Sequence, residues 1–188
     1  MFHIQRPTES EIRAFADRQK RAAFSYEQVG ATSVQLPSGY AIARAEYCVG
    51  RSKVDYERAV IELRQFRHYD DPQGKIRLVD PRPAFEEGAT VVLLARHLGV
   101  WTLGACRVVY TFREDRRFGF AYGTLEHVLQ GEERFELELG DDDRVVFRLT
   151  AFSRANSWIT KCGGPMIRCF QTAAGRSYAR GLELAMRS

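Results

Sequence analysis

The stretch at residues 118–154, FGFAYGTLEHVLQGEERFELELGDDDRVVFRLTAFSR, predicts three consecutive strands of one sheet. Apolar side chains recur there at every second position, which is the period of a β-strand. Phe118, Phe120 and Tyr122 share one face of the first strand. The run Gly-Asp-Asp-Asp at residues 140–143 predicts a tight turn between the second and third strands, because Gly and Asp adopt the required backbone angles readily. Strands joined by short hairpins pair antiparallel, since parallel pairs need long crossovers.

The second strand, at residues 135–139, is predicted to have one buried face and one solvated face. Phe135, Leu137 and Leu139 alternate with charged residues at positions 134, 136 and 138. Such alternation is typical of a sheet that is covered on one side only. The third strand follows at residues 145–152 with the same period.

The flanking sequence predicts helices on both sides of these strands. The first helix begins with a capping box, Thr8-x-x-Glu11, in which each residue satisfies a backbone N–H of the other. Gly104 is the expected bend or bulge of a long strand. The predicted order is a helix at residues 8–24, a strand at 40–49, a helix at 52–66, a short strand at 76–79, strands at 90–98 and 100–112, the three strands above, and a long helix from residue 165.

This order predicts an α+β fold in which a curved antiparallel sheet wraps around the long C-terminal helix, with an extra N-terminal helix. It is similar to the helix-grip layout of START and Bet v 1-like domains. Gly175 and Gly181 indicate that the last helix either presses its backbone against the sheet or leaves space beside it. We expect a single domain over residues 1–188, with residues 1–39 as the N-terminal helix and connection and residues 40–188 as the helix-grip core.

Composition narrows the class of partner. Basic residues exceed acidic ones by only 28 to 24, and the two are interspersed, so we expect no nucleic-acid partner. The N-terminus lacks the apolar core of a signal peptide, and no run reaches the roughly 18 apolar residues of a transmembrane segment. The four cysteines at positions 48, 106, 162 and 169 form no CxxC pair and are expected to be reduced thiols of a cytoplasmic protein.

Several segments resemble the family called domain of unknown function 1990. They occur in the family's order from about residue 24 to residue 184: SY at 25–26, VGAT at 29–32, RVVY at 107–110, FGFAYGTL at 118–125, GEERF at 131–135, AFSR at 151–154, and GP at 164–165 followed by Gln171. The loop at residues 125–130 lacks the family's proline-rich sequence, and Asn156 replaces an expected proline. The resemblance implies a shared fold, and the family has no assigned activity.

The densest set of polar residues lies on and beside the hairpin at residues 122–134. Glu132 or Glu133 could form an acid–base pair with His127, or both carboxylates could be a solvated hairpin end that pairs with Arg107 or Arg148. The alternation selects Glu133 as the carboxyl with a shifted pKa if either is buried, since it shares the face of the apolar side chains.

Three arginines, Arg107, Arg148 and Arg154, interrupt apolar strands, where an unpaired cation is costly. Each is expected to reach water, an internal carboxylate, or an anionic ligand, and the internal pair is the favoured interpretation. Cys162 precedes a helix but lacks a nucleophile motif, and Cys169 is interpreted as a core residue. The four histidines show no metal-ligand spacing and no phosphate loop is present, so we expect neither a metal nor a cofactor.

The leading hypothesis is a protein that binds an apolar or lipid-like small molecule between the sheet and the C-terminal helix. The predicted polar contacts are Arg107, Tyr122, Glu133 and Arg148, and the predicted wall is Trp101, Phe120 and Phe170. Two alternatives stay open at this point: an enzyme that uses the same pocket, and a protein-interaction domain with a filled core. The sequence does not indicate the oligomeric state.

Overall fold

The structure is a computed structural model that describes residues 2–79, 81–97, 99–155 and 164–188, without the side chains of residues 2, 97 and 164–172. The described residues form one antiparallel sheet with the strand order β2-β8-β7-β6-β5-β4-β3, and β1 pairs with β5 outside this path. The strands are β1 (Phe2–His3), β2 (Ala41–Gly50), β3 (Ile76–Leu78), β4 (Thr90–His97), β5 (Val100–Arg113), β6 (Arg117–Thr124), β7 (Leu129–Leu139) and β8 (Val145–Ala155).

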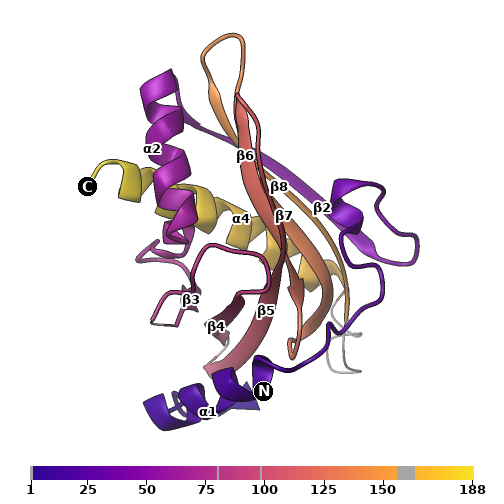
Figure 1. Cartoon of the computed structure of the whole chain (residues 1–188). Coiled ribbons are helices and arrows are strands. Elements are labelled where there is room, and N and C mark those ends of the chain that lie inside the picture. The colour runs from indigo at the N-terminus through magenta and orange to yellow at the C-terminus, as the bar shows by residue number, and fades with distance from the viewer. Residues whose placement is uncertain (1, 80, 98, 156–163) are drawn as a thin grey trace.

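Helices cover both faces of the curved sheet (Figure 1). They are α1 (Glu9–Gln19), α2 (Lys53–Arg64) and α4 (Gly164–Met186), with short 3-10 turns η1 (Ala31–Ser33) and η2 (Arg67–Tyr69). The helices α2 and α4 lie on the inner face, where their apolar side chains share one core with β4 to β8. The helix α1 packs on the outer face against β4 and β5 through a second, smaller core around Phe15 and Leu103. The predicted architecture, a curved antiparallel sheet around the last helix, is therefore confirmed.

Local sequence signals explain where the elements begin and turn. In α1, Thr8 Oγ1 accepts the N–H of Glu11 at 3.3 Å while Glu11 Oε2 accepts the N–H of Thr8 at 2.7 Å, so the predicted capping box is present. Ser52 caps α2 in the predicted way. The turn after β7 places Asp143 at a positive φ of 60°, a conformation that Asp tolerates better than most residues.

Of the predicted bend or bulge at Gly104, the bulge is not found there, since Gly104 pairs with Leu93 in continuous register. The register of β5 against β6 shifts between Val108 and Tyr110 instead. A Cβ atom at Gly104 would lie 2.3 Å from Cδ2 of His127, so this glycine makes room for the histidine ring.

The prediction that one face of β7 is solvated is also wrong. Glu132 and Glu136 lie on its outer face and are only 2% and 7% exposed. The segment after α1 crosses this face, where the rings of Tyr26 and Phe152 pack edge-on with centroids 5.6 Å apart. Alternation along one strand does not reveal a covering segment that comes from about a hundred positions away.

The C-terminal helix approaches its neighbours very closely at two glycines. A Cβ atom at Gly175 would lie 2.9 Å from the hydroxyl of Tyr47 in β2. One at Gly181 would lie 2.5 Å from the backbone oxygen of His68 in η2. Of the two arrangements that the sequence left open, α4 presses its backbone against its neighbours at these positions.

Replacing Gly181 with alanine tests this contact. The added methyl group meets backbone rather than a movable side chain, so overpacking should lower the free energy of unfolding by about 1–3 kcal/mol. The gain in helix propensity, about 1 kcal/mol, acts in the opposite direction. Urea unfolding measures the difference, and Arg176→Ala on the exposed side of α4 is the control, with an expected change within about 0.5 kcal/mol. A Gly181→Ala variant as stable as the wild type would contradict the close approach.

Candidate functional site

Cross-strand pairing divides the inner face of the sheet into rows. In one row Leu137 lies between Phe118 and Phe147, and in the next Phe135 lies between Phe120 and Leu149. All these side chains are buried in the core beneath α2 and α4. This half of the inner face is filled, which supports the fold and leaves no room for a ligand.

The following two rows carry small side chains on β8 and β2. Glu133 lies between Tyr122 and Ala151, and Ala151 pairs in turn with Ala43 of β2. One row further, Gly131 pairs with Ser153, which pairs with Ala41. The side chains on β8 and β2 therefore extend less far from the sheet in these rows than the side chains of the aromatic rows do. Along β7 accessible surface returns at Glu133, which is half-buried whereas Phe135 is fully buried, and the alanines of the edge strand β2 are half-buried in both halves.

A chain of hydrogen bonds ends on Glu133 at the border between the two halves. The hydroxyl of Tyr69, from η2, donates to the hydroxyl of Tyr122 at 3.1 Å. The hydroxyl of Tyr122 donates to Oε2 of Glu133 at 2.8 Å. Tyr178 of α4 packs its ring against Tyr69 with centroids 5.2 Å apart. One phenol thus contacts the carboxyl group directly, and two further phenols stand behind it at the edge of the filled core.

Burial dominates the ionisation of this group. It raises the pKa of Glu133 from its ordinary value of 4.5 to about 7, although the hydrogen bond from Tyr122 acts in the opposite direction. Burial and the nearby carboxylate both raise the pKa of Tyr122 well above its ordinary value, so this phenol stays protonated. Glu133 therefore changes charge close to neutral pH while its hydrogen-bond donor does not.

Two histidines lie on the same inner face. His127 sits over Gly104, and its Nδ1 accepts the N–H of Leu129 at 3.1 Å. Burial lowers the pKa of His127 to about 4. His68 is completely buried among aromatic rings, the nearest being Tyr69 with centroids 4.2 Å apart, and burial lowers the pKa of His68 to about 3. Both imidazoles are neutral at physiological pH.

The predicted site residues are only partly brought together. Tyr122 and Glu133 are in direct contact, and Glu133 is the carboxyl with the shifted pKa, as the alternation indicated. Phe120 is in the filled half, stacked on Phe135. Trp101 lies on the outer face, within cation–π distance of Arg6 and Arg96. The side chains of Phe170, Cys162 and Cys169 are outside the described residues.

Arg107 and Arg148 also point away from the inner face. Arg107 donates to the carbonyl oxygens of Gln19, Lys20 and Ala22, and thereby takes up the last carbonyls of α1 and the turn after it. This explains why α1 ends at Gln19 and not near residue 24 as predicted. Arg148 pairs with two carboxylates, those of Glu46 at 2.7 Å and of Glu138.

These contacts decide between the interpretations of the arginines. The favoured internal ion pair is present for Arg148. Arg154 instead donates to the side chain of Gln130 at 2.9 Å and lies over the ring of Tyr40. Backbone carbonyls as partners of Arg107 were not foreseen, because they belong to a helix more than 80 positions earlier.

No cluster of His, Cys, Asp and Glu within the described part of the chain could hold a metal ion. Likewise, none of the helices in that part is long and apolar enough to cross a membrane.

Comparison with known families matches residues 25–181 to the domain of unknown function DUF1990. The chain belongs to this family. A UPF0548 protein of Deinococcus radiodurans is 36% identical, with 98% of each chain covered. A UPF0548 protein of Dictyostelium discoideum is 26% identical, with 91% of this chain and 89% of the relative covered. The resemblance seen in the sequence is thereby confirmed.

Solved structures confirm the helix-grip fold of this DUF1990 chain. A START superfamily protein from Mycobacterium smegmatis has a TM-score of 0.54 at 17% identity, over 77% of this chain and 95% of that one. Norcoclaurine synthase from Thalictrum flavum has a TM-score of 0.52 at 12% identity, over 82% and 100%. The ZhuI aromatase/cyclase from Streptomyces has a TM-score of 0.51 at 12% identity, over 78% and 94%. At these identities the likeness concerns the fold.

The segments that resemble the DUF1990 family meet on the outer face around Glu132. This carboxylate accepts the hydroxyl of Tyr26 at 2.7 Å, the N–H of Gly30 at 2.7 Å, and the N–H of Thr32 at 3.0 Å together with its hydroxyl. Gly123 leaves room for Tyr26, since a Cβ atom there would lie 2.0 Å from the hydroxyl oxygen. These motifs therefore fasten the N-terminal connection of the DUF1990 domain to the sheet, and Glu132 is a structural group.

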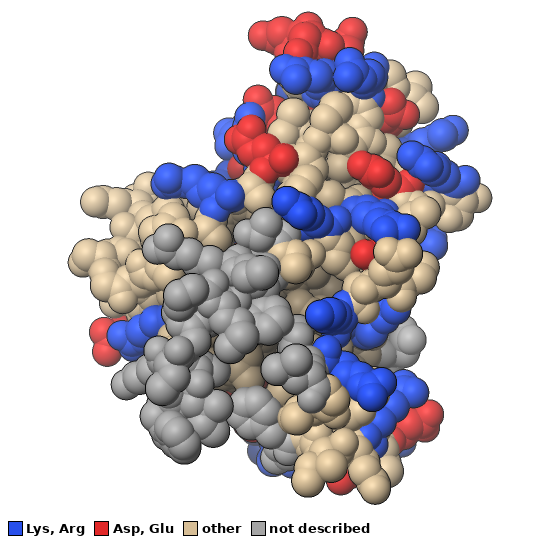
Figure 2. Space-filling view, turned by 180° about the vertical axis from the view of Figure 1, so that it is seen from behind, with Lys and Arg blue, Asp and Glu red and all other residues tan. Residues whose placement is uncertain are grey.

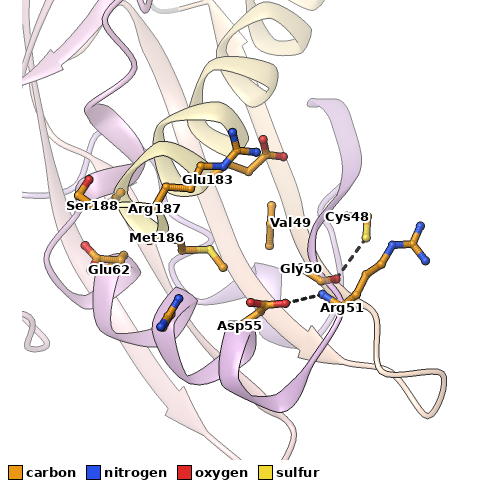
Figure 3. Close-up of a pocket in the computed structure, with 12 residues that line it drawn as sticks. Cys48, Val49, Gly50, Arg51, Asp55, Glu62, Glu183, Met186, Arg187 and Ser188 are labelled. Atoms are coloured by element: carbon orange, nitrogen blue, oxygen red, sulfur yellow. Dashed lines mark hydrogen bonds between the residues drawn. The ribbon is translucent and has the colours of Figure 1, made fainter.

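An open groove of about 760 Å³ lies at the other end of the DUF1990 domain, among the end of β2, the start of α2 and the last turn of α4 (Figure 3). Three cations and three anions line it: Arg51, Arg58, Arg187, Asp55, Glu62 and Glu183. Asp55 caps the start of α2, because its Oδ2 accepts the N–H of Arg51 at 2.8 Å. This hydrogen bond also lowers the pKa of Asp55. Two of the lining carboxylates therefore have structural partners, Asp55 with the backbone of Arg51 and Glu62 with the side chain of Arg67 at 3.5 Å.

The surface seen from behind carries Lys and Arg side chains in a broken band with Asp and Glu among them (Figure 2). The inner-face row around Glu133 is therefore the candidate site of this DUF1990 protein.

Replacing Tyr26 with phenylalanine tests the structural role of Glu132. The variant leaves the buried carboxylate of Glu132 with one donor fewer. Because hydrogen bonds to charged groups contribute about 1.5–3 kcal/mol, the free energy of unfolding should fall by about that amount. Tyr40→Phe is the matched control, because the hydroxyl of Tyr40 donates to the neutral side chain of Gln28, and its loss should cost about 1 kcal/mol or less. Equal losses in urea unfolding would show that Glu132 does not hold the connection.

The pKa of Glu133 predicts a pH dependence of stability. Between pH 4.5 and about 7 the unfolded chain has lost this proton while the folded chain retains it, so wild-type stability falls as pH rises through this window. Glu133→Gln removes the effect and should gain up to about 3 kcal/mol relative to wild type between pH 4.5 and pH 8. The exposed variant Glu57→Gln should follow the wild type. A difference between Glu133→Gln and wild type that is constant with pH would mean that Glu133 ionises normally.

Proposed function

We propose that the protein binds an apolar small molecule with a polar end, and that the molecule lies on the small-residue rows of the inner face with its polar end at Glu133. The observation that carries this proposal is the half-buried carboxyl of Glu133, bonded to Tyr122 and bordered by Ala151, Ala43 and Gly131. An ionisable group with a raised pKa beside an apolar surface is a common mark of a functional site.

The division of the inner face supports this position for the ligand. The aromatic rows are packed and fully buried, so they stabilise the fold. In the alanine and glycine rows Gly131, Ala151 and Ser153 are buried, and accessible surface remains at Glu133 and at Ala41 and Ala43 of the edge strand β2. A ligand there could use the filled core as one wall and the hydrogen-bonded carboxyl as its polar contact. Trp101, Arg107 and Arg148 are not part of this site, because they lie on the outer face.

The comparisons support a binding role in general terms. The fold is shared with a START superfamily protein and with two proteins named as enzymes, the synthase and the aromatase/cyclase. Fold likeness transfers no activity by itself, so the argument for binding rests on Glu133 and its neighbours.

An enzyme that uses the same site is the second candidate, and the pKa of Glu133 favours it. A carboxyl that titrates near pH 7 is suited to donate and accept protons at physiological pH. The predicted partnership with His127 has weaker support, because a pKa of about 4 makes this imidazole a poor base. Glu133 with Tyr122 would be the acting pair, and turnover of a bound molecule would distinguish an enzyme from a binding protein.

Filling the alanine row tests the proposal. Ala43→Leu adds apolar volume on the inner face of the edge strand, and Arg44→Leu places the same side chain on the outer face as control. Native mass spectrometry of the purified proteins, followed by a thermal-shift screen of apolar metabolites, should find a bound molecule with wild type and Arg44→Leu. Affinity for that molecule should fall at least about tenfold in Ala43→Leu, since overlap with a ligand is costly.

Two outcomes would overturn the proposal. One is a wild-type protein that carries no adduct and shows no thermal shift with any compound. The other is a folded Ala43→Leu variant, checked by circular dichroism, that binds as tightly as the control.

A further inference from the structure

The hydrogen bonds at Glu133 restrict the chemistry of the ligand's polar end, given the binding site proposed above. The two hydroxyls that lead to Glu133 are already used as donors: the proton of Tyr69 is donated to Tyr122, and the proton of Tyr122 is donated to Glu133. What this hydrogen-bonded series can still offer to a ligand is the lone pairs of Oε1 of Glu133. Among the described residues no donor is bonded to this oxygen, and Glu133 keeps part of its surface accessible.

The cations near these strands are engaged on the opposite face. Arg107 is bonded to backbone carbonyls, Arg148 to Glu46 and Glu138, and Arg134 to Glu136 at 2.6 Å. On the inner face, the row neighbours of Glu133 are Tyr122 and Ala151. An anionic end placed there would meet an ionised carboxylate with no described cation to neutralise it, and repulsion between like charges is strong in a low-dielectric site.

We propose that the polar end of the ligand is a hydrogen-bond donor, a hydroxyl or an amine, and that the site rejects carboxylate and phosphate ends. A hydroxyl or ammonium supplies the proton that Oε1 lacks, and an ammonium also pairs with the charge. This is the opposite of the less favoured interpretation of the strand arginines, in which they contact an anionic ligand.

The discrimination should depend on pH through Glu133. Below about pH 7 the carboxyl is protonated and can itself donate, so rejection of anions weakens. The other described titratable groups that face this part of the core do not change charge between pH 5.5 and 8.5. The pKa values of His127 and His68 are lowered to about 4 and about 3. Burial raises the pKa of each remaining group, the thiol of Cys106 and the phenols of Tyr69, Tyr122 and Tyr178.

The experiment compares probes that share an apolar part and differ at one end. Dissociation constants are measured by calorimetry for two series of probes. The first series is decanol, decylamine and decanoate. The second series is 2-naphthol, 2-naphthylmethylamine and 2-naphthoate. At pH 8.5, wild type should bind the amine and the alcohol at least about tenfold more tightly than the carboxylate of the same series. This ratio should shrink at pH 5.5. In Glu133→Gln, whose amide both donates and accepts, the ratio should shrink at both pH values, while Glu57→Gln keeps the wild-type pattern.

The outcomes separate this inference from the binding proposal. If no probe of either series binds and no adduct is found, the binding site itself is refuted. If probes bind and the carboxylate binds as tightly as the amine at pH 8.5, the binding site stands and the donor requirement is refuted. If the preference persists unchanged in a folded Glu133→Gln variant, another group selects the polar end and the assignment to Glu133 is wrong.

Discussion

The contact between α4 and its neighbours is the constraint on which the rest of the structure depends. At Gly181 the helix backbone lies so near the backbone of η2 that no side chain fits between them. This approach closes the aromatic half of the inner face and brings Tyr178 beside Tyr69. Because a packed core leaves no voids of useful size, the filled half serves stability and any site must lie beyond it. Glu133 marks that border.

Two consecutive glutamates have different roles because they lie on opposite faces of the same strand. Glu132 points outward into a set of hydrogen-bond donors from the N-terminal connection, and four bonds satisfy it completely. Glu133 points inward, receives one described bond and borders alanine and glycine. A satisfied buried carboxylate stabilises a fold, whereas a buried carboxyl with spare acceptor capacity and a raised pKa costs stability. Retaining such a group is understandable where it contacts a ligand.

Much of the fold could be predicted because its signals are local. Period-two alternation located β6 to β8, and it also placed Glu133 on the inner face. The capping residues Thr8 and Ser52 marked the starts of α1 and α2. The site was predicted less well. Trp101, Arg107 and Arg148 are predicted to line the pocket, yet all three lie on the outer face, where Trp101 packs against Arg6, Arg107 bonds the carbonyls after α1 and Arg148 pairs with Glu46.

The sequence by itself determined the strands, their antiparallel pairing, the final helix and the face on which Glu133 lies, because backbone periodicity and turn chemistry depend on neighbouring residues. Only the tertiary structure decided that the outer face is covered, that Gly104 receives the ring of His127, and that the cations face outward while the carboxyl faces inward. These features depend on which segments meet in space. Segments about a hundred positions apart are brought into contact by packing, which no local pattern records.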